Sequence, residues 1–163
     1  KVRGGGMAAG IGLESNIISA TLKEKNLQKI DLANFNSPGQ IVISGPALEI
    51  DSSIPVLKEA GAKLVLPLKV SGAFHSEMMK EPSQEFAVFL KEFSFAAPNF
   101  PIFANVTASE YSNSEEIGGL LVKQMYSSVL WSKSIQKMRS FGAVEFIECG
   151  PGNVLTKLLR QIP

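Results

Sequence analysis

The only histidine of the chain, His75, lies in the segment VSGAFHSEMM. The unperturbed pKa of a histidine side chain is near neutral pH, so this side chain can accept and return a proton under physiological conditions. A lone histidine is more often structural or exposed than catalytic. Ser71 and Ser76 flank it, but the chain contains no G-x-S-x-G elbow to expose a serine as a nucleophile. The sequence therefore offers a general base without an evident nucleophile.

Other residue types that could do chemistry give weaker signals. Cys149 ends the apolar run VEFIEC, where a single cysteine is more often a small buried hydrophobic residue than the nucleophile of a Cys–His enzyme. Since H-x-x-x-H, C-x-x-C and carboxylate clusters are missing from the sequence, we expect no metal site. The turn CGPGNVL follows an expected strand and opens an expected helix, a place that can hold an anion, but a tight turn from strand to helix is the better explanation of its two glycines.

Composition limits the class of protein. The chain has 163 residues, of which 45% are hydrophobic and 19% charged, enough for one compact core or two small lobes. Sixteen basic and fifteen acidic residues are interspersed, which argues against partners such as nucleic acid or an anionic membrane. No apolar run is long enough to span a membrane. We expect a cytoplasmic protein, or an organellar one after removal of a transit peptide.

The chain divides into two regions that differ in the length and order of their expected secondary-structure elements. Between residues 6 and 67 the expected elements are short, and they follow the order strand, helix, strand, strand, helix, strand. Ser37-Pro38-Gly39 forms the turn between the two central strands, and Pro55 should begin, kink or restart the second helix before Gly61 ends it. This order is that of a ferredoxin-like split βαβ unit.

From Val70 onward the elements lengthen and alternate between helix and strand. Phe86, Phe89, Leu90 and Phe93 recur at helical spacing and predict one buried stripe on a helix that ends near residue 92. The segments PIFAN and VEFIEC are expected as strands, the second one buried, and Asn153 as the N-cap of the last helix.

One further helix carries a polar residue on its apolar face. Ile117, Leu120 and Leu121 mark this face, and the next position on it is Gln124. An amide that faces a core should have a hydrogen-bond partner, so Gln124 is a second candidate residue of a site.

Several segments, in order along nearly the whole chain, resemble the malonyl-CoA:acyl-carrier-protein transacylase family of fatty-acid and polyketide synthesis. They are GMAAGIGL, NFNSPGQ, GAFHS, FANVTA, LVKQMY and ECGPGNVL. The resemblance implies an α/β fold with two parts. Residues 1–69 would form a small ferredoxin-like subdomain, and residues 70–163 the C-terminal part of a large α/β-hydrolase-like subdomain.

The resemblance also implies an activity and its partners. In this family a serine is acylated by malonyl-CoA and passes the malonyl group to the phosphopantetheine thiol of an acyl carrier protein, without a cofactor or metal. His75 matches the catalytic base, and Gln124 matches the residue whose backbone carbonyl orients the imidazole. Phe74 matches a position that selects malonyl over 2-methyl substrates, and Asn36 is assigned to substrate contact.

The chain departs from the family in one respect. The family's serine lies in a G-H-S-x-G elbow near a carboxylate-binding arginine, and that elbow is missing from this sequence. Arg3 is not equated with that arginine. We therefore expect a C-terminal portion of a transacylase, with the serine and arginine on polypeptide outside these residues. An acyl hydrolase on the same framework, a Cys–His enzyme and a non-catalytic lobe that docks a carrier protein are the alternatives.

Overall fold

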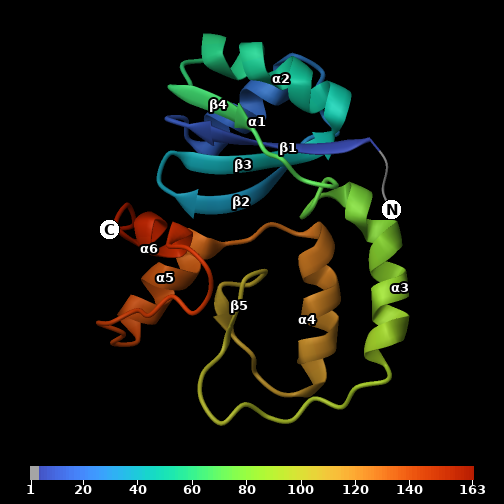
Figure 1. Ribbon diagram of the computed structural model, residues 1–163, viewed down its shortest axis with the longest axis vertical. Coiled ribbons are helices and arrows are strands. Elements are labelled where there is room, and N and C mark those ends of the chain that lie inside the picture. The colour runs from blue at the N-terminus through green and yellow to red at the C-terminus, as the bar shows by residue number, and fades with distance from the viewer. Residues whose placement is uncertain (1–3) are drawn as a thin grey trace.

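The computed structural model describes residues 4–163, and its first part is a four-stranded sheet covered by two helices (Figure 1). The elements are β1 (Gly5–Ile11), α1 (Ser15–Glu24), β2 (Asp31–Ser37), β3 (Gln40–Pro46), α2 (Ala47–Glu59) and β4 (Leu64–Pro67). The strand order is β2-β3-β1-β4, and every neighbouring pair is antiparallel. The order of elements predicted for residues 6–67 is thus the one observed.

Local chemistry explains the hairpin between β2 and β3. Pro38 presets φ for a turn, Gly39 takes a φ of +73°, and a β-branched run follows in β3. The carbonyl of Gly39 also accepts a hydrogen bond of 2.7 Å from the N–H of Gly12 at the end of β1. Helix α2 contains Pro55, so this residue does not begin or restart the helix.

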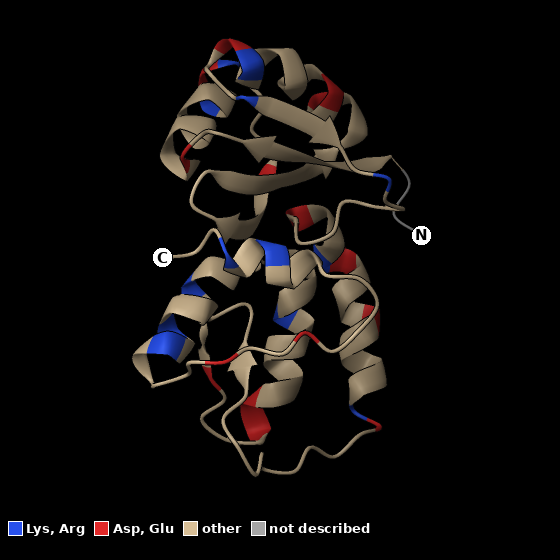
Figure 2. Ribbon diagram, turned by 60° about the vertical axis from the view of Figure 1, so that its left-hand side comes forward, with Lys and Arg blue, Asp and Glu red and all other residues tan. Residues whose placement is uncertain are grey.

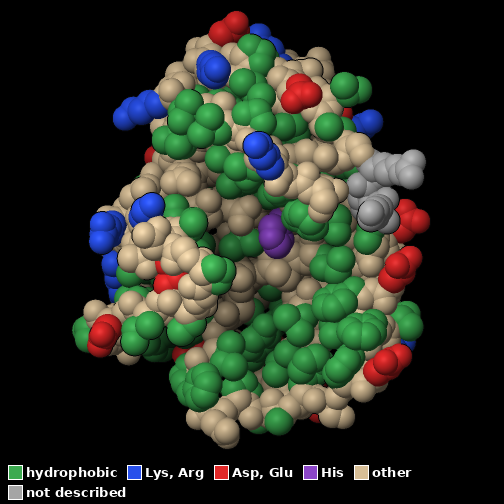
Figure 3. Space-filling model, in the orientation of Figure 1, with side chains coloured by type: hydrophobic (Ala, Val, Ile, Leu, Met, Phe, Trp, Pro, Cys, Tyr) green, Lys and Arg blue, Asp and Glu red, His purple; other side chains and the backbone are tan. Residues whose placement is uncertain are grey.

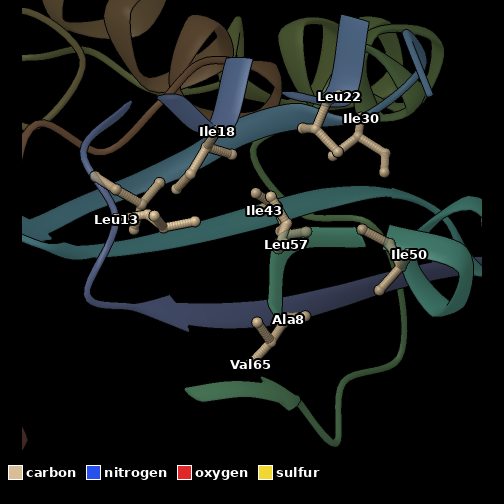
Figure 4. Packing of buried hydrophobic residues seen from close by; sticks show 10 residues of the cluster. Ala8, Leu13, Ile18, Leu22, Ile30, Ile43, Ile50, Leu57 and Val65 are labelled. Carbon is tan, nitrogen blue, oxygen red and sulfur yellow. The ribbon is translucent and has the colours of Figure 1, made fainter. Parts of the chain in front are cut away.

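The core of this first part lies between the sheet and its two helices. Ile18 from α1, Ile43 from β3 and Leu57 from α2 meet there with exposed fractions of 1% or less (Figure 4). Fully burying one such side chain stabilises a fold by about 1.5–3 kcal/mol. Residues 4–69 therefore enclose a core of their own.

The second part is mainly helical. Its elements are η1 (Glu77–Met79), α3 (Lys80–Leu90), β5 (Phe103–Ala104), β6 (Ser109–Glu110), α4 (Glu115–Tyr126), α5 (Trp131–Ser140) and α6 (Val154–Leu159). Helices α3 and α4 lie side by side, while α5 and α6 pack below β2 (Figure 1). The Ser37 hydroxyl donates to the side-chain oxygen of Gln161 at 3.0 Å and joins the end of the chain to the sheet.

Two expectations of burial in the second part were wrong. The stripe on α3 is not buried, since Phe89 and Phe93 are each 51% exposed. Residues 143–149 form no strand, and Val144 and Ile147 are 96% and 79% exposed. In both segments the pattern of apolar residues is typical of a buried element. Among residues 4–163, however, no second layer covers these side chains.

The strand expected from PIFAN is present as the two-residue strand β5 (Phe103–Ala104). Two smaller expectations failed. Cys149 is exposed instead of buried. Asn153 occupies the N-cap position of α6, but its side chain makes no capping hydrogen bond. The carboxylate of Glu148 accepts hydrogen bonds from the N–H groups of Leu155 at 3.1 Å and Thr156 at 2.8 Å instead.

Charged side chains of both signs are distributed over both parts of the molecule (Figure 2). This agrees with a formal net charge of +1. Every helix within residues 4–163 is too short or too polar to cross a membrane.

Candidate active site

The loop that carries His75 connects β4 to η1 and holds an unusual backbone conformation. The φ angle of His75 is +60°, in the left-handed region that non-glycine residues rarely occupy. Its N–H donates to the Met125 carbonyl at 3.0 Å, and the buried Ser76 hydroxyl donates to the Ala73 carbonyl at 2.7 Å. These contacts hold the loop in a conformation that local preference alone would not select, which is common at functional sites.

Strand β1 closely supports the same loop. At Gly5 the two backbones approach so closely that a Cβ atom on this glycine would lie 2.5 Å from the backbone nitrogen of Ala73. Only glycine fits this contact, so β1 limits how far the His75 loop can move toward the sheet.

The imidazole of His75 is oriented by helix α4. Its Nδ1 lies 2.8 Å from the backbone oxygen of Gln124. A carbonyl oxygen can only accept, so Nδ1 carries the ring proton and Nε2 keeps its lone pair. The Gln124 side-chain nitrogen lies 3.3 Å from Nδ1 but donates to the Ser127 carbonyl at 3.1 Å, because two donors cannot bond each other. This arrangement is that of a base ready to take a proton at Nε2.

Both acceptors come from the last turn of α4. The carbonyls of Gln124 and Met125 have no partner within the helix, and the ring and backbone N–H groups of His75 satisfy them. The C-terminal end of a helix also carries partial negative charge. It therefore takes the position next to the imidazole that a carboxylate occupies in a serine hydrolase triad.

Strand β2 holds this end of α4 in place. The segment 127–130 runs along the edge of β2, where the Ser128 hydroxyl donates to the Leu32 carbonyl at 2.6 Å. The Val129 N–H donates to the Ala33 carbonyl at 2.8 Å, and the Phe35 N–H donates to the Val129 carbonyl at 2.9 Å. The relative position of base and orienting carbonyl is thus set by the sheet.

The same strand also anchors the start of the helix that follows the base. The Asp31 carboxylate accepts a hydrogen bond of 2.8 Å from the N–H of Glu77. Sequence reasoning missed Asp31, Ser128 and Met125. Asp31 is the first residue of β2 and lies 46 residues before Glu77, so no local pattern indicates this contact. A backbone carbonyl can belong to any residue type and leaves no signal either.

The predicted residues occupy different places around His75. Gln124 is in direct contact with the His75 ring. Phe74 precedes His75 in the chain and is 39% exposed. Asn36 is half-buried on β2, and its side chain forms no hydrogen bond within the described part of the chain. His75 itself lies at the surface, in a hollow between the sheet and the helices below it (Figure 3).

The nearby serines are poor nucleophiles in this arrangement. Ser76 is fully buried, and its hydroxyl donates a hydrogen bond to the Ala73 carbonyl. Ser71 lies in an exposed bend. Cys149 lines a different cavity of about 130 Å³ with Trp131 and Leu155, and His75 is not among the residues of that cavity. Residues 4–163 contain no cluster of three potential metal ligands. Arg3 lies outside the described residues.

Comparisons with known proteins place this geometry in context. No family model matches the sequence. The polyketide biosynthesis malonyl CoA-acyl carrier protein transacylase PksC of Bacillus subtilis is 43% identical over 162 residues, which are 99% of this chain and 56% of PksC. The chain is homologous to malonyl CoA-acyl carrier protein transacylases. It spans about half the length of the transacylases that it matches.

Solved structures of transacylases share the fold of this chain. The malonyl CoA-acyl carrier protein transacylase of Burkholderia pseudomallei superposes with a TM-score of 0.94 at 38% identity, covering 99% of this chain and 57% of the other. A malonyl-transacylase in complex with a type II polyketide acyl carrier protein superposes with a TM-score of 0.92 at 36% identity, covering 97% and 52%. The chain therefore has the α/β fold of these transacylases over nearly its whole length.

Proposed function

We propose that this chain is the part of a malonyl-CoA:acyl-carrier-protein acyltransferase that carries the catalytic base. The observation that supports the proposal is the 2.8 Å contact between His75 Nδ1 and the Gln124 carbonyl, which leaves Nε2 free to accept a proton. The homologous transacylases supply the substrate class, malonyl-CoA and a phosphopantetheinylated acyl carrier protein. No cofactor is required.

The chemistry follows from the free Nε2. His75 takes the proton of a serine hydroxyl as the serine oxygen attacks the thioester carbonyl carbon of malonyl-CoA. The carbon–sulfur bond then breaks, and the imidazolium returns the proton to the leaving coenzyme A thiolate. In the second half-reaction His75 takes the proton of the phosphopantetheine thiol. The thiolate attacks the serine ester, and the serine oxygen leaves with the proton.

A neutral carbonyl suffices as the orienting group because the substrate is activated. An aspartate in a hydrolase triad stabilises the imidazolium by a full charge, whereas the end of α4 supplies only a partial one. A thioester is more reactive toward nucleophiles than an amide, so a weaker stabilisation of the imidazolium supports the reaction.

The remaining assignments belong to the same proposal. Residues 1–69 act as the ferredoxin-like small subdomain and residues 70–163 as the C-terminal part of the hydrolase-like large subdomain. Phe74 limits the space beside the second carbon of the acyl group, and Asn36 contacts substrate from β2. The serine and the cation that binds the malonyl carboxylate come from polypeptide outside these residues, since the sequence contains no G-x-S-x-G elbow.

Mass spectrometry after incubation with malonyl-CoA tests this function. The 163-residue chain alone should keep its unmodified mass. A chimera in which this chain replaces the matched segment of PksC should gain one malonyl group on a serine of the PksC part and transfer it to a holo acyl carrier protein. An adduct on Ser71, Ser76 or Cys149 of the isolated chain would overturn the proposal. Release of free malonate without transfer would indicate a hydrolase instead.

A further inference from the structure

His75 adopts a backbone conformation that its own loop does not favour. Its φ angle of +60° costs a non-glycine residue free energy, and such a conformation persists only where surrounding contacts hold it. The ring must also stay within hydrogen-bond distance of the Gln124 oxygen, which lies 2.8 Å from Nδ1. Both requirements depend on how the His75 loop and the end of α4 are held relative to each other.

Two consecutive residues of β2 hold the two segments that carry the base and its orienting carbonyl. On the side of the base, the Asp31 carboxylate accepts a hydrogen bond of 2.8 Å from the N–H of Glu77. On the side of the orienting carbonyl, the Leu32 backbone oxygen accepts a hydrogen bond of 2.6 Å from the Ser128 hydroxyl, just beyond the end of α4. A single short piece of strand therefore fixes both segments.

These hydrogen bonds form a closed ring through His75. The backbone N–H of His75 donates to the Met125 carbonyl at 3.0 Å, and its Nδ1 donates to the Gln124 carbonyl at 2.8 Å, so the base joins the two segments that β2 holds. The piece of chain between α4 and Ser128 is stiffened from within, because the Gln124 side chain donates to the Ser127 carbonyl at 3.1 Å. In such a network the loss of one link affects the others.

The side chains of Asp31 and Ser128 are the parts of this ring that depend on residue type. The N–H and carbonyl of Val129 also bond to β2, at 2.8 and 2.9 Å, but every non-proline residue offers these groups. The ladder of β2 and β3 pairs Asp31 with Ser44 through the backbone, so the strand does not require a carboxylate at its first residue. The carboxylate and the hydroxyl are thus the links that a substitution can remove singly.

We propose that Asp31 and Ser128 are positioning residues, a clamp that fixes His75 and the Gln124 carbonyl to β2 and thereby keeps the ring proton on Nδ1. For its effect on acyl transfer this inference rests on the proposed function, but the position of the ring proton can be measured without any reaction. Both side chains act through His75. Their loss should therefore lower the rate of acylation and leave the affinity for malonyl-CoA unchanged.

The ring proton can be observed directly, because His75 is the only histidine of the chain. With ¹⁵N-labelled histidine the 163-residue chain gives one pair of ring signals, and a protonated nitrogen differs from one with a free lone pair. At a pH at which the ring is neutral, the unsubstituted chain should carry the proton on Nδ1. Asp31→Ala and Ser128→Ala should each reduce this tautomer, since a released ring exchanges between both. Unchanged signals in both variants would overturn the clamp.

The same signals can be followed in the chimera with PksC. The histidines of the PksC part add further signals there, and the difference from a His75→Asn chimera identifies those of His75. The unsubstituted chimera should again show the proton on Nδ1, and the two alanine variants should again lose it. A tautomer that stays intact in both variants of the folded chimera would overturn the clamp.

Conservative variants separate position from charge. Asp31→Asn keeps an oxygen acceptor without the charge, and Ser128→Thr keeps the hydroxyl, so both should retain the Nδ1 tautomer. If Asp31→Asn lost the tautomer as Asp31→Ala does, Asp31 would act through its charge and the proposal would fail.

A matched control separates position from general stability. The buried Ser53 hydroxyl donates to the Ile50 carbonyl at 2.7 Å within α2, outside the ring of hydrogen bonds that includes His75. Ser53→Ala therefore also removes one side-chain hydrogen bond, and it should lower the unfolding midpoint while leaving the ring signals of His75 unchanged. An equal loss of the tautomer in Ser53→Ala and Ser128→Ala would contradict the clamp.

Acylation of the chimera by malonyl-CoA supplies a kinetic measurement. Each alanine variant should slow acylation at saturating malonyl-CoA by about ten-fold, because misplacing a catalytic group by about 1 Å can cost about 100-fold. The half-saturating concentration should not change. The double variant should be about 10- to 20-fold slower, since one break already opens the ring, whereas independent effects would multiply to about 100-fold. A multiplied loss would contradict the closed ring.

The outcomes for the clamp and for catalysis can be separated. If the unsubstituted chimera forms no malonyl adduct while both alanine variants lose the Nδ1 tautomer, the proposed function fails and the clamp stands. If the chimera forms the adduct and both variants keep the tautomer and the rate, the clamp fails and the proposed function stands.

Discussion

The two parts of the molecule differ in how far they bury their apolar side chains. Residues 4–69 bury Ile18, Ile43 and Leu57 completely between a sheet and two helices. Residues 70–163 leave Phe93 and Val144 half or almost fully exposed, although their spacing is equally regular. A stable domain needs at least two layers packed around one core. The first part has both layers, whereas no further layer within residues 4–163 covers Phe93 and Val144.

His75 lies where the two parts meet, and this explains why its geometry is nevertheless well defined. Its loop follows β4, its ring bonds to the end of α4, and the segment 127–130 binds α4 to the edge of β2. The sheet of the first part thus holds in place the end of α4, and the Gln124 carbonyl at that end orients the base. The second part leaves an exposed apolar surface below the base (Figure 3).

The largest effect is expected at this junction. In the chimera with PksC, His75→Ala should lower the rate of serine acylation by about two to four orders of magnitude, the usual contribution of a positioned general base. Rapid-quench measurement of the malonyl adduct would show it. Near-normal acylation would remove His75 from the mechanism.

A second substitution separates catalysis from backbone strain. Alanine is disfavoured at the φ of +60° that His75 adopts, whereas asparagine tolerates the left-handed region. His75→Asn should therefore be as slow as His75→Ala but closer to the unsubstituted protein in its unfolding midpoint.

The contrast between the two parts can be measured directly as stability. In the isolated chain, Leu57→Ala should reduce the free energy of unfolding by about 2–5 kcal/mol, because it leaves a cavity in an enclosed core. Phe93→Ala, at a half-exposed position, should change it by about 0.5 kcal/mol or less. Urea denaturation gives both values. Equal losses would contradict the view that only the first part has a complete core.

A smaller effect concerns substrate choice beside the base. Phe74→Ser should open space next to the second carbon of the acyl group and raise the ratio of kcat/KM for methylmalonyl-CoA over malonyl-CoA by about ten-fold. One methyl group in a pocket is worth about 1–3 kcal/mol, so a complete switch is not expected. An unchanged ratio in the chimera would exclude a selective role for Phe74.

The smallest expected effect is a pH dependence of the stability of the fold, and it arises from Glu148 in the second part. Hydrogen bonds from the hydroxyl and backbone N–H of Thr156, then from the N–H of Leu155, lower the pKa of Glu148 below its ordinary value. A carboxylate with a lowered folded pKa stabilises the fold above its unfolded pKa, and this contribution disappears as pH falls through the folded value.

The matched variant removes the titrating group. Glu148→Gln should destabilise the chain slightly at neutral pH, and its unfolding midpoint should fall less on acidification than that of the unsubstituted chain. Circular dichroism melts across the acidic range would compare the two. Parallel pH profiles would show that Glu148 does not cap α6 through its charge.

The sequence by itself determined what depends on neighbours along the chain. The Pro38-Gly39 turn and the order of elements in residues 6–67 were predictable, because turn geometry and hydrophobic periodicity are local properties. His75 was identifiable as the only histidine. Gln124 was identifiable by its amide on an apolar face and by the resemblance to transacylases.

The tertiary structure decided what depends on contacts between distant segments. The spacing of Phe89 and Phe93 predicted a helix but could not show whether another layer covers them, and VEFIEC could not become a strand without a neighbour. The acceptor for the His75 N–H is the backbone oxygen of Met125, a group that every residue carries. Periodicity reports which face is apolar, whereas burial and hydrogen-bond partners exist only once two surfaces meet.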